Sequence, residues 1–397
     1  MAGVGSDPPF LSVSVTEPVK MGSGMQAYIS YRVSTKTNMQ DFRETEKIVI
    51  RRFSDFVWLY ERLMECYKGA VIPSLPGKNA VEKFRFTAEF IEVRRKALDV
   101  FLKRVTAHPE LRKSEDVKNF LQADEEIWAM EKTRSTESSV FKKKPSDFMQ
   151  MLKDVQSRVS DAVMRKEKVV EETDPEYERM KHYVVELEEH LAEAQRHAMR
   201  LVKRQRESGK NLADFSKALK LLSQCESGAL KQTLSDVADR AEELAAKQQK
   251  QGLDLLLTFE EPLKEYVGIV QNIKVAMADR AHAYREHQEL LEAYSLKKLS
   301  LEKQRLLRPD KAGDMEADLQ LSKEQCDEAQ TRYQRIVDLM NQDMLRFQEG
   351  KTHDLGLVLQ NFARAQAELA MCTADTWGTL LPVLGSSSMT REEDAYT

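Results

Sequence analysis

The chain has 397 residues, of which 32% are charged and only 7% are aromatic, and its formal net charge is −4. This length leaves room for two or three domains, and a charged composition poor in glycine and proline favours long solvated helices over a compact β-rich body. Basic residues are in excess before residue 122 and acidic residues after it. An anionic partner therefore suits the N-terminal part, and the acidic remainder excludes general coating of nucleic acid.

No apolar run approaches the roughly 20 residues that a membrane-spanning helix needs. The first nine residues lack the charged and apolar regions of a signal peptide, so we expect a cytosolic protein whose contact with membranes is peripheral. The four cysteines lie far apart without a CxxC pair, which indicates separate thiols and neither a disulfide framework nor a zinc site.

Three β-rich runs open the chain, at residues 10–15, 28–33 and 48–50. Apolar and polar side chains alternate along them, and turn-forming residues separate them at 22–24 and 37–38. The pattern predicts a meander of three antiparallel strands.

Three helices are expected after the strands, each with an apolar stripe at helical spacing. Between the first two, Pro73 and Pro76 force an extended, polyproline-like segment. His108-Pro109 ends the second helix. Strands and helices together predict an α+β domain over residues 10–122, behind a disordered stretch at 1–9. The expected helices cover residues 55–68, 87–106 and 114–121.

A polar linker is expected at 123–147 and an amphipathic helix at 148–172. An apolar stripe with basic residues beside it is typical of a helix lying in a membrane interface. Packing of the same stripe on a coiled coil is the alternative. The stripe contains Phe148, Leu152 and Val155, and the basic residues beside it include Lys153 and Arg158.

The rest of the chain, residues 173–385, reads as an all-α, long three-helix coiled coil, followed by a disordered tail at 386–397. Apolar residues recur at alternating steps of three and four, for example from Tyr177 to Leu201, which is the pattern of a coiled-coil seam. A kink is expected at Pro262, and 308–313 is the only clear break. Helices of 50–80 residues would be roughly 75–120 Å long, and dimerisation would cover the seams that three helices leave open.

Signals of catalysis or metal binding are weak. The seven histidines include no i, i+4 pair, and no nucleotide-binding loop or nucleophile motif is present. Acidic residues alternate with lysines at helical spacing, which is typical of solvated helix faces. We therefore expect neither an enzyme nor a metal site.

Three cations, Arg52, Lys78 and Arg94, lie on separate elements: the end of the third strand, the exit of the proline segment and the second helix. Together with the aromatic Phe53 and the hydroxyl of Ser54, they would suit a phosphorylated ring, since guanidinium groups bind phosphate in a bidentate manner. The alternative is that each cation only solvates the surface and that Ser54 only caps a helix.

Four sequence blocks resemble, in order and spacing, those of a PX (phox-homology) domain, and the long helical region resembles a BAR domain. The combination is similar to the sorting nexins of the PX–BAR class over nearly the whole chain. The fold implied is a PX domain at 10–122 and a BAR dimerisation and curvature domain at 173–385. The blocks are residues 51–56, 72–78, 90–98 and 108–109.

The resemblance implies recognition of phosphatidylinositol 3-phosphate, with the 3,5-bisphosphate as an alternative, and no cofactor. Arg52 would hold the 3-phosphate, Phe53 would pack under the inositol ring, and Ser54 would donate near the 3-phosphate. Lys78 would meet the 1-phosphate, and Arg94 would bond the inositol hydroxyls.

Further membrane contacts are expected from one apolar and two basic sets of residues. The apolar set would dip into the bilayer, and the basic sets would meet anionic lipid on a BAR dimer. Loop packing and solvated helix faces are the alternatives. The sets are Ile72, Leu75 and Val81; Arg200, Lys203 and Arg204; and Lys297 and Lys298.

The function implied by the resemblance is endosomal sorting. A dimer with two lipid pockets would bind membranes by avidity, on endosomes (multivesicular or prevacuolar) and the trans-Golgi network. Its expected partners are a second copy or another sorting nexin and the retromer core subunits, with no nucleic acid. The alternative function is a cytosolic coiled-coil scaffold whose basic N-terminal module docks acidic proteins.

Overall fold

A computed structural model describes residues 9–77, 86–138, 172–307 and 312–384 apart from 383. Packing divides the chain into two units. The first unit comprises Met1–Glu188 and Gly268–Gln348, and the second comprises Glu189–Val267 and Glu349–Thr397. The long helices pass through both units.

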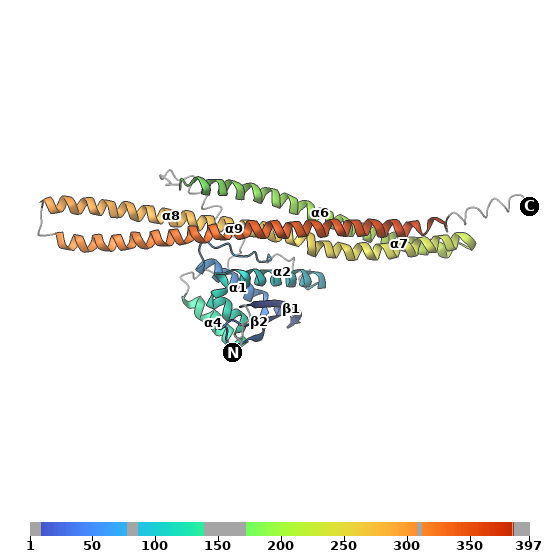
Figure 1. Ribbon diagram of the computed structural model, residues 1–397. Helices are drawn as coiled ribbons and strands as arrows, with labels where there is room; N and C mark the ends of the chain where they lie inside the picture. Colours follow the sequence, from blue (N-terminus) through green and yellow to red (C-terminus); the bar gives the residue numbers. More distant parts are fainter. Residues whose placement is uncertain (1–8, 78–85, 139–171, 308–311, 383, 385–397) are drawn as a thin grey trace, which may run out of the picture. The chain divides into compact units, whose positions relative to one another are not determined.

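The strands of the first unit form the expected meander. They pair antiparallel in the order β1-β2-β3 (Figure 1). Because side chains alternate along a strand, one face of the sheet is apolar and buried, with Val15 and Val33 fully inaccessible to solvent. The strands are β1 (Leu11–Met21), β2 (Tyr28–Thr37) and β3 (Glu46–Arg52).

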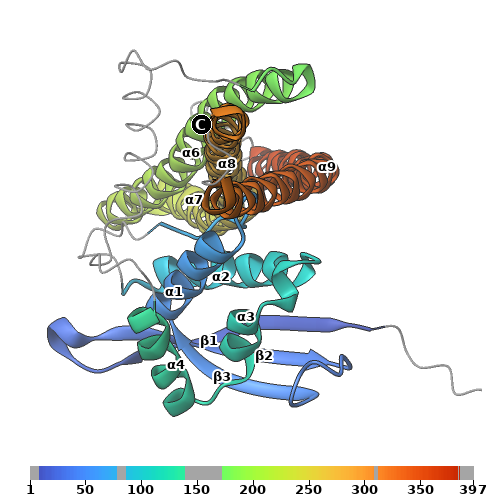
Figure 2. The same ribbon diagram turned by 90° about the vertical axis from the view of Figure 1, so that its left-hand side faces the viewer.

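Helices α1 and α2 cover one face of this sheet (Figure 2). Helix α2 is tied to β1 by two side chains: Arg95 donates to the carbonyl of Val15 at 2.7 Å, and the Val15 amide donates to Asp99 at 2.8 Å. Thr87 caps the start of α2, and His108 follows its end, as expected. The helices are α1 (Phe53–Cys66), α2 (Ala88–Ala107), α3 (Glu115–Gln122) and α4 (Glu125–Ser138).

Helix α4 lies in the stretch 123–147 that we expected to be a linker. Its anchor is Trp128, which is 2% exposed and packs edge-on against Trp58 and Phe120. Lys132 of α4 also pairs with the buried carboxylate of Asp55 at 2.6 Å. The N-terminal module therefore includes at least one helix beyond α3.

The long helices are three in number among the described residues, as predicted, because α7 continues through a π-helical turn, η4, into α8. This turn ends at Glu260, two residues before Pro262, where we expected a kink, and single π turns commonly interrupt long helices. Residues 226–227 are not helical and separate α6 from α7, so the expectation that 308–313 is the only clear break is wrong. The elements are α6 (Pro175–Cys225), α7 (Gly228–Leu255), η4 (Leu256–Glu260), α8 (Glu261–Leu307) and α9 (Ala312–Gly378).

The buried stripe of α6 follows the predicted seam only as far as Ala198. The next buried residue is Val202, whereas Leu201, which the strict heptad places in the seam, is 52% exposed. Val202 is four residues after Ala198, whereas the heptad expects a step of three at this point. Such a change of step rotates the buried face around the helix. Phe215 and Leu222 are consequently half exposed, and Ser216 is buried in their stead.

The second unit has its own apolar core. The ring of Phe259, from η4, stacks on Phe362 of α9 with centroids 4.2 Å apart, and Leu255 and Val358 pack around this pair. Tyr266 donates a hydrogen bond to Asp354 at 2.7 Å. These contacts join the helices of this unit independently of the sheet.

Candidate functional site

The adjacent arginines at the end of β3 have opposite environments, because successive side chains of a strand point to opposite faces. Arg51 is 1% exposed. Its guanidinium donates to the carbonyls of Phe120 at 3.0 Å and Ala123 at 2.5 Å and stacks on Trp128. Burial lowers the pKa of Arg51 to about 10, so it stays charged at neutral pH and serves the structure.

Arg52 faces outward, with 53% of its side chain exposed. Its backbone amide donates to the carboxylate of Asp55 at 2.9 Å, which fixes the first turn of α1. Its guanidinium lies 5.9 Å from the centre of the Tyr28 ring and only loosely approaches Asp55. Ser54 follows in the first turn of α1 and is exposed. A surface cation thus lies beside a helix N-terminus, where anions are favoured.

Arg94 of α2 is held between two aromatic rings. Its guanidinium carbon lies 4.1 Å from the centre of the Phe53 ring and 4.4 Å from that of Phe90. Phe90 is four residues earlier on α2, so both side chains lie on one helix face. Burial lowers the pKa of Arg94, yet an arginine remains protonated. Phe90 belongs to the block 90–98 but was not predicted as a site residue, although its i, i+4 spacing from Arg94 indicates a shared helix face.

The side chain of Arg94 also reaches the proline segment, donating to the carbonyl of Gly77 at 3.2 Å. It therefore contacts the residue after Arg52 and the residue before Lys78. Lys78 itself lies outside the described residues, so its predicted role stays a prediction. Within the described part of the chain, Phe53 and Arg94 are in contact, and Arg52 directly precedes Phe53 in sequence.

The residues of the proline segment that we expect to enter the bilayer, Ile72 and Leu75, pack inside the first unit. Ile72 is fully buried in the core of the first unit, so the expectation that it enters a bilayer is wrong. Leu75 is half-buried and packs against the same core. The alternative of loop packing describes both residues, because other parts of the unit cover the segment. Val81 lies outside the described residues.

The remaining predicted residues are on the long helices or outside the described chain. Arg200, Lys203 and Arg204 are exposed on α6. On α8, Lys298 is exposed, whereas Lys297 pairs with Asp318 at 3.0 Å. The expected amphipathic helix, with Phe148, Leu152, Lys153, Val155 and Arg158, lies outside the described residues.

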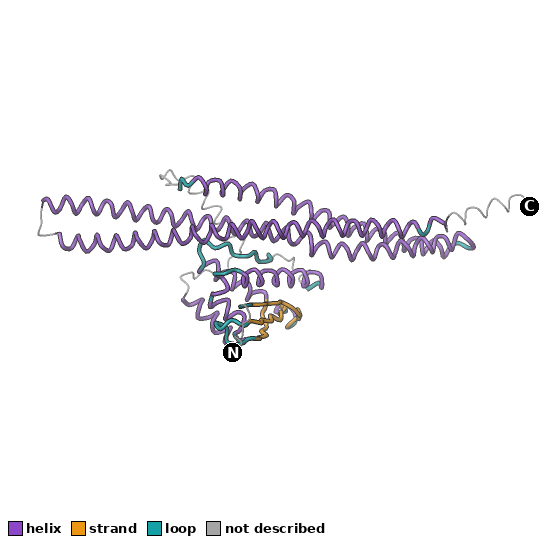
Figure 3. The backbone as a smooth tube through the Cα atoms, in the orientation of Figure 1, coloured by secondary structure: helices purple, strands orange, loops and turns teal. Residues whose placement is uncertain are grey.

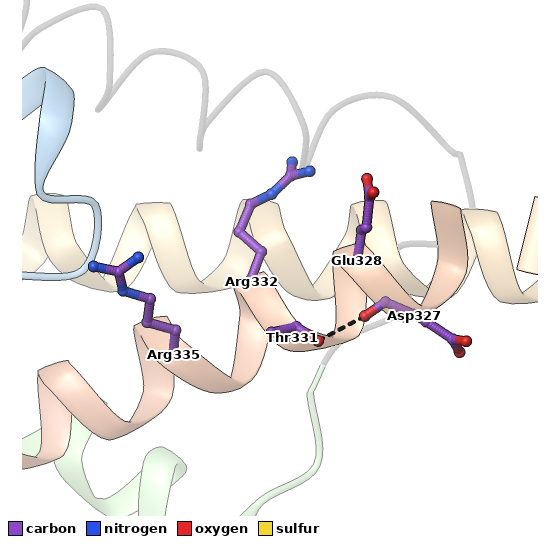
Figure 4. A pocket seen from close by; sticks show the side chains of 5 residues that line it. All are labelled: Asp327, Glu328, Thr331, Arg332 and Arg335. Atoms are coloured by element: carbon purple, nitrogen blue, oxygen red, sulfur yellow. Dashed lines mark hydrogen bonds between the residues drawn. The ribbon is translucent and has the colours of Figure 1, made fainter. Parts of the chain in front are cut away.

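A shallow hollow on α9 shows no catalytic arrangement (Figure 4). Thr331 donates to the carbonyl of Asp327 in its own helix at 2.8 Å, and Arg332 pairs with Glu286 of α8 at 2.8 Å. Among the described residues, no three His, Cys, Asp or Glu side chains are placed to hold a metal ion. None of the described helices has the length and apolarity required to cross a bilayer.

Two protein families match the chain. The PX domain family matches residues 39–124, and the family described as Vps5 C terminal like matches residues 141–383. The first match includes Arg52, Phe53 and Arg94. The second covers more than half of the chain.

Named relatives agree with these matches. Sorting nexin 1 of Arabidopsis thaliana is 55% identical over 382 residues, which cover 96% of this chain and 94% of that protein. Human Sorting nexin-1 is 26% identical over 94% of this chain and 71% of its own length. The cryo-EM structure of the SNX-BAR Mvp1 tetramer superposes with a TM-score of 0.66 at 18% identity, covering 93% of this chain and 99% of that one.

Proposed function

The chain belongs to the sorting nexins that join a PX domain to a BAR-like, Vps5-type region, and from this premise we propose that it binds phosphatidylinositol 3-phosphate on endosomal membranes. PX and BAR domains are membrane-binding and curvature-related modules, so peripheral membrane binding is the general function of this architecture. The lipid identity, the compartment and the sorting role are the specific parts of the proposal.

The arrangement around Arg94 is the observation that carries the lipid assignment. The guanidinium of Arg94 contacts the rings of Phe53 and Phe90, and the Gly77 carbonyl accepts a hydrogen bond from it. This leaves further guanidinium N–H groups to donate to inositol hydroxyls. Arg52, at the N-terminus of α1, would take the 3-phosphate with Ser54, and Lys78 would meet the 1-phosphate.

A second copy of the chain, or another sorting nexin, would cover apolar side chains that the long helices expose. Large apolar residues are exposed on α6, α8 and α9, which a single chain does not bury. Dimerisation would place two headgroup pockets on one assembly, and avidity would then multiply a modest single-site affinity. The residues include Phe215, Leu222, Leu299, Leu357 and Leu359.

Basic residues would add an electrostatic contribution to membrane binding. Arg200, Lys203 and Arg204 are exposed on one stretch of α6, and cations near an anionic leaflet contribute about 1 kcal/mol each. Lys298 would act in the same way, whereas Lys297 is already paired with Asp318. The stripe at 148–172 would insert into the interface.

The cellular role that we propose is retromer-linked sorting of cargo on endosomes (multivesicular or prevacuolar) and the trans-Golgi network. Its support is the family membership and the similarity to Sorting nexin 1 of Arabidopsis thaliana over 96% of the chain. The protein would recognise a lipid and a curvature together, and the retromer core subunits would join it on the membrane.

Vesicle sedimentation with Arg52→Gln tests the lipid assignment. Wild-type protein should bind vesicles containing phosphatidylinositol 3-phosphate better than phosphatidylserine vesicles of matched charge, and Arg52→Gln should lose this preference. Arg43→Gln is the matched control, since Arg43 is also exposed in the N-terminal module. Equal binding of Arg52→Gln and wild type would refute the pocket, and binding to acidic proteins alone would favour the scaffold.

A further inference from the structure

The segment from Gly69 to Gly77 joins α1 to the candidate headgroup site without forming a helix or strand (Figure 3). Its last residue accepts the hydrogen bond from Arg94. Because backbone groups in a buried segment need hydrogen-bond partners, the partners of this segment determine where its end lies. They come largely from the long helices α8 and α9.

Helix α8 holds the middle of the segment through Asn272. The amide of Asn272 donates to the carbonyl of Ile72 at 2.7 Å, and its oxygen accepts from the hydroxyl of Tyr60 at 2.9 Å. Asn272 is 2% exposed, and the three residues form a buried chain of hydrogen bonds. Burial raises the pKa of Tyr60, so the phenol remains a donor.

Helix α9 holds the segment through a buried carboxylate. Asp343, which is 3% exposed, accepts a hydrogen bond from the Val71 amide at 2.8 Å. Its other oxygen lies 2.9 Å from the ring nitrogen of His108, at the end of α2, and also contacts Arg346. A single carboxylate therefore connects the segment, α2 and α9.

Two glycines, one on α8 and one in the segment, allow the segment and the long helices to pack close together. A Cβ atom on Gly268 of α8 would lie 2.9 Å from the Cβ of Ser74 and closer still to its hydroxyl oxygen. The hydroxyl can rotate away, but relief of the contact with the Ser74 Cβ requires a shift of the segment. At the other end, Gly69 has a φ of +83°, and a Cβ atom there would lie 2.7 Å from the side chain of Ile336 on α9. Both approaches require glycine.

The contacts of Ser74 also limit where the end of the segment, at Gly77, can lie. Ser74 is only three residues from Gly77, and Pro76 restricts a φ angle between them. A shift of Ser74 would therefore move the Gly77 carbonyl, and with it the hydrogen bond that orients Arg94.

We propose that Gly268 and Asn272 of α8 and Asp343 of α9 are positioning residues of the headgroup pocket. They touch no lipid, but they hold the proline segment where its end supports Arg94. This inference rests on the proposed lipid recognition and deepens it, since the affinity of a single pocket would depend on the long helices, apart from any avidity of a dimer.

Calorimetric titration of the full chain with a soluble, short-chain phosphatidylinositol 3-phosphate tests the proposal, because a soluble lipid reports one pocket without avidity. Asn272→Ala and Gly268→Ala should each weaken binding about tenfold, within the range found for residues that act on a site through packing. Asn341→Ala is the matched control, because Asn341 is exposed on α9, and it should bind like wild type. Binding to plain phosphatidylserine vesicles should be unchanged in all variants.

The two variants act by different means, one removing hydrogen bonds and one adding a single methyl group. If circular dichroism shows that Asn272→Ala is unfolded, Gly268→Ala decides. Wild-type affinity in the folded variants, with only a lower melting temperature, would reduce these residues to structural contacts and overturn the proposal. A wild-type chain that does not bind the soluble lipid would overturn the lipid assignment itself, and this inference with it.

Discussion

The guanidinium carbon of Arg94 lies 4.1 Å from the centre of the Phe53 ring, so α2 is joined by a cation–aromatic contact to the first residue of α1, directly after β3. This contact and the hydrogen bond to the Gly77 carbonyl hold the Arg94 side chain, and its other guanidinium N–H groups can still donate. Phe90 covers the guanidinium at 4.4 Å. A planar group held in this way is suited to bind hydroxyl or phosphate oxygens in a fixed geometry.

Phe90→Leu should weaken the binding of soluble phosphatidylinositol 3-phosphate about 2- to 30-fold, because leucine keeps the apolar contact but loses the cation–π attraction. Titration calorimetry of the folded variant measures the change. Phe215→Leu, at a half-exposed position on α6, is the control and should have no effect. An unchanged affinity in Phe90→Leu would mean that Phe90 does not orient Arg94.

Arg51→Leu should destabilise the protein by about 3 kcal/mol or more, because the carbonyls of Phe120 and Ala123 would lose a charged, buried donor. Arg52→Leu should change stability by less than about 0.5 kcal/mol, since Arg52 is exposed. Thermal unfolding of the two variants side by side makes this comparison. Similar melting temperatures would contradict the structural assignment of Arg51.

Glu260→Gln should stabilise the protein at neutral and higher pH. Burial raises the pKa of Glu260 above its ordinary value of 4.5, so the folded chain binds its proton more tightly than the unfolded chain. The free energy of unfolding therefore falls as the pH rises from the unfolded-state pKa to the raised folded-state pKa. Above the folded-state pKa, the full cost of burying the ionised carboxylate is present. Glutamine has no such cost.

The melting temperature of Glu260→Gln should accordingly exceed that of wild type at pH 8, and the difference should close below pH 4.5. Glu243→Gln is the control of opposite sign, since hydrogen bonds from Lys247 and Arg240 lower the pKa of Glu243. A difference for Glu260→Gln that is the same at every pH would show that its charge is not the cause.

Arg280→Met should lower stability by about 3–5 kcal/mol, because it leaves the buried Glu172 carboxylate without its charged partner and with only the Tyr333 hydroxyl to donate to it. Arg280 is 1% exposed, bonds Glu172 at 2.5 Å, and stacks on Tyr177 at 3.9 Å. The double variant Arg280→Met with Glu172→Leu should recover part of the loss, as in other buried pairs. Thermal unfolding of both variants tests the coupling, and a single variant that melts like wild type would disprove it.

Local sequence patterns were sufficient to predict the strands, the helices α1 to α3 and the three long helices, because each pattern depends on residues close in sequence. The burial of Ile72 could not be predicted in this way, since Asn272, which bonds its carbonyl, lies 200 residues later. The shift of the α6 stripe at Val202 could not be predicted either, because Val202 packs in a cluster with Leu255 and Phe259, which are distant in sequence. Helix α4 was not predicted because its apolar stripe is weak and its contacts, through Trp128 and Lys132, are with residues distant in sequence.

For the candidate site, the sequence brought out Arg52, Phe53 and Arg94 through the order of their blocks, and the structure places Phe53 and Arg94 in contact. The partners that orient Arg94 are a ring one helical turn away and a backbone carbonyl. A carbonyl has no signature in the sequence, because every residue carries one.

Because Arg51 points inward and Arg52 outward, substitutions of these two neighbouring residues should have different effects in a living cell. Substitution of the inward residue should raise the fraction of unfolded chains, which proteases remove, so the protein would become scarce. Substitution of the outward residue should leave its amount unchanged and scatter the protein away from its membrane. Western blotting would detect the first defect, and fluorescence microscopy would detect the second.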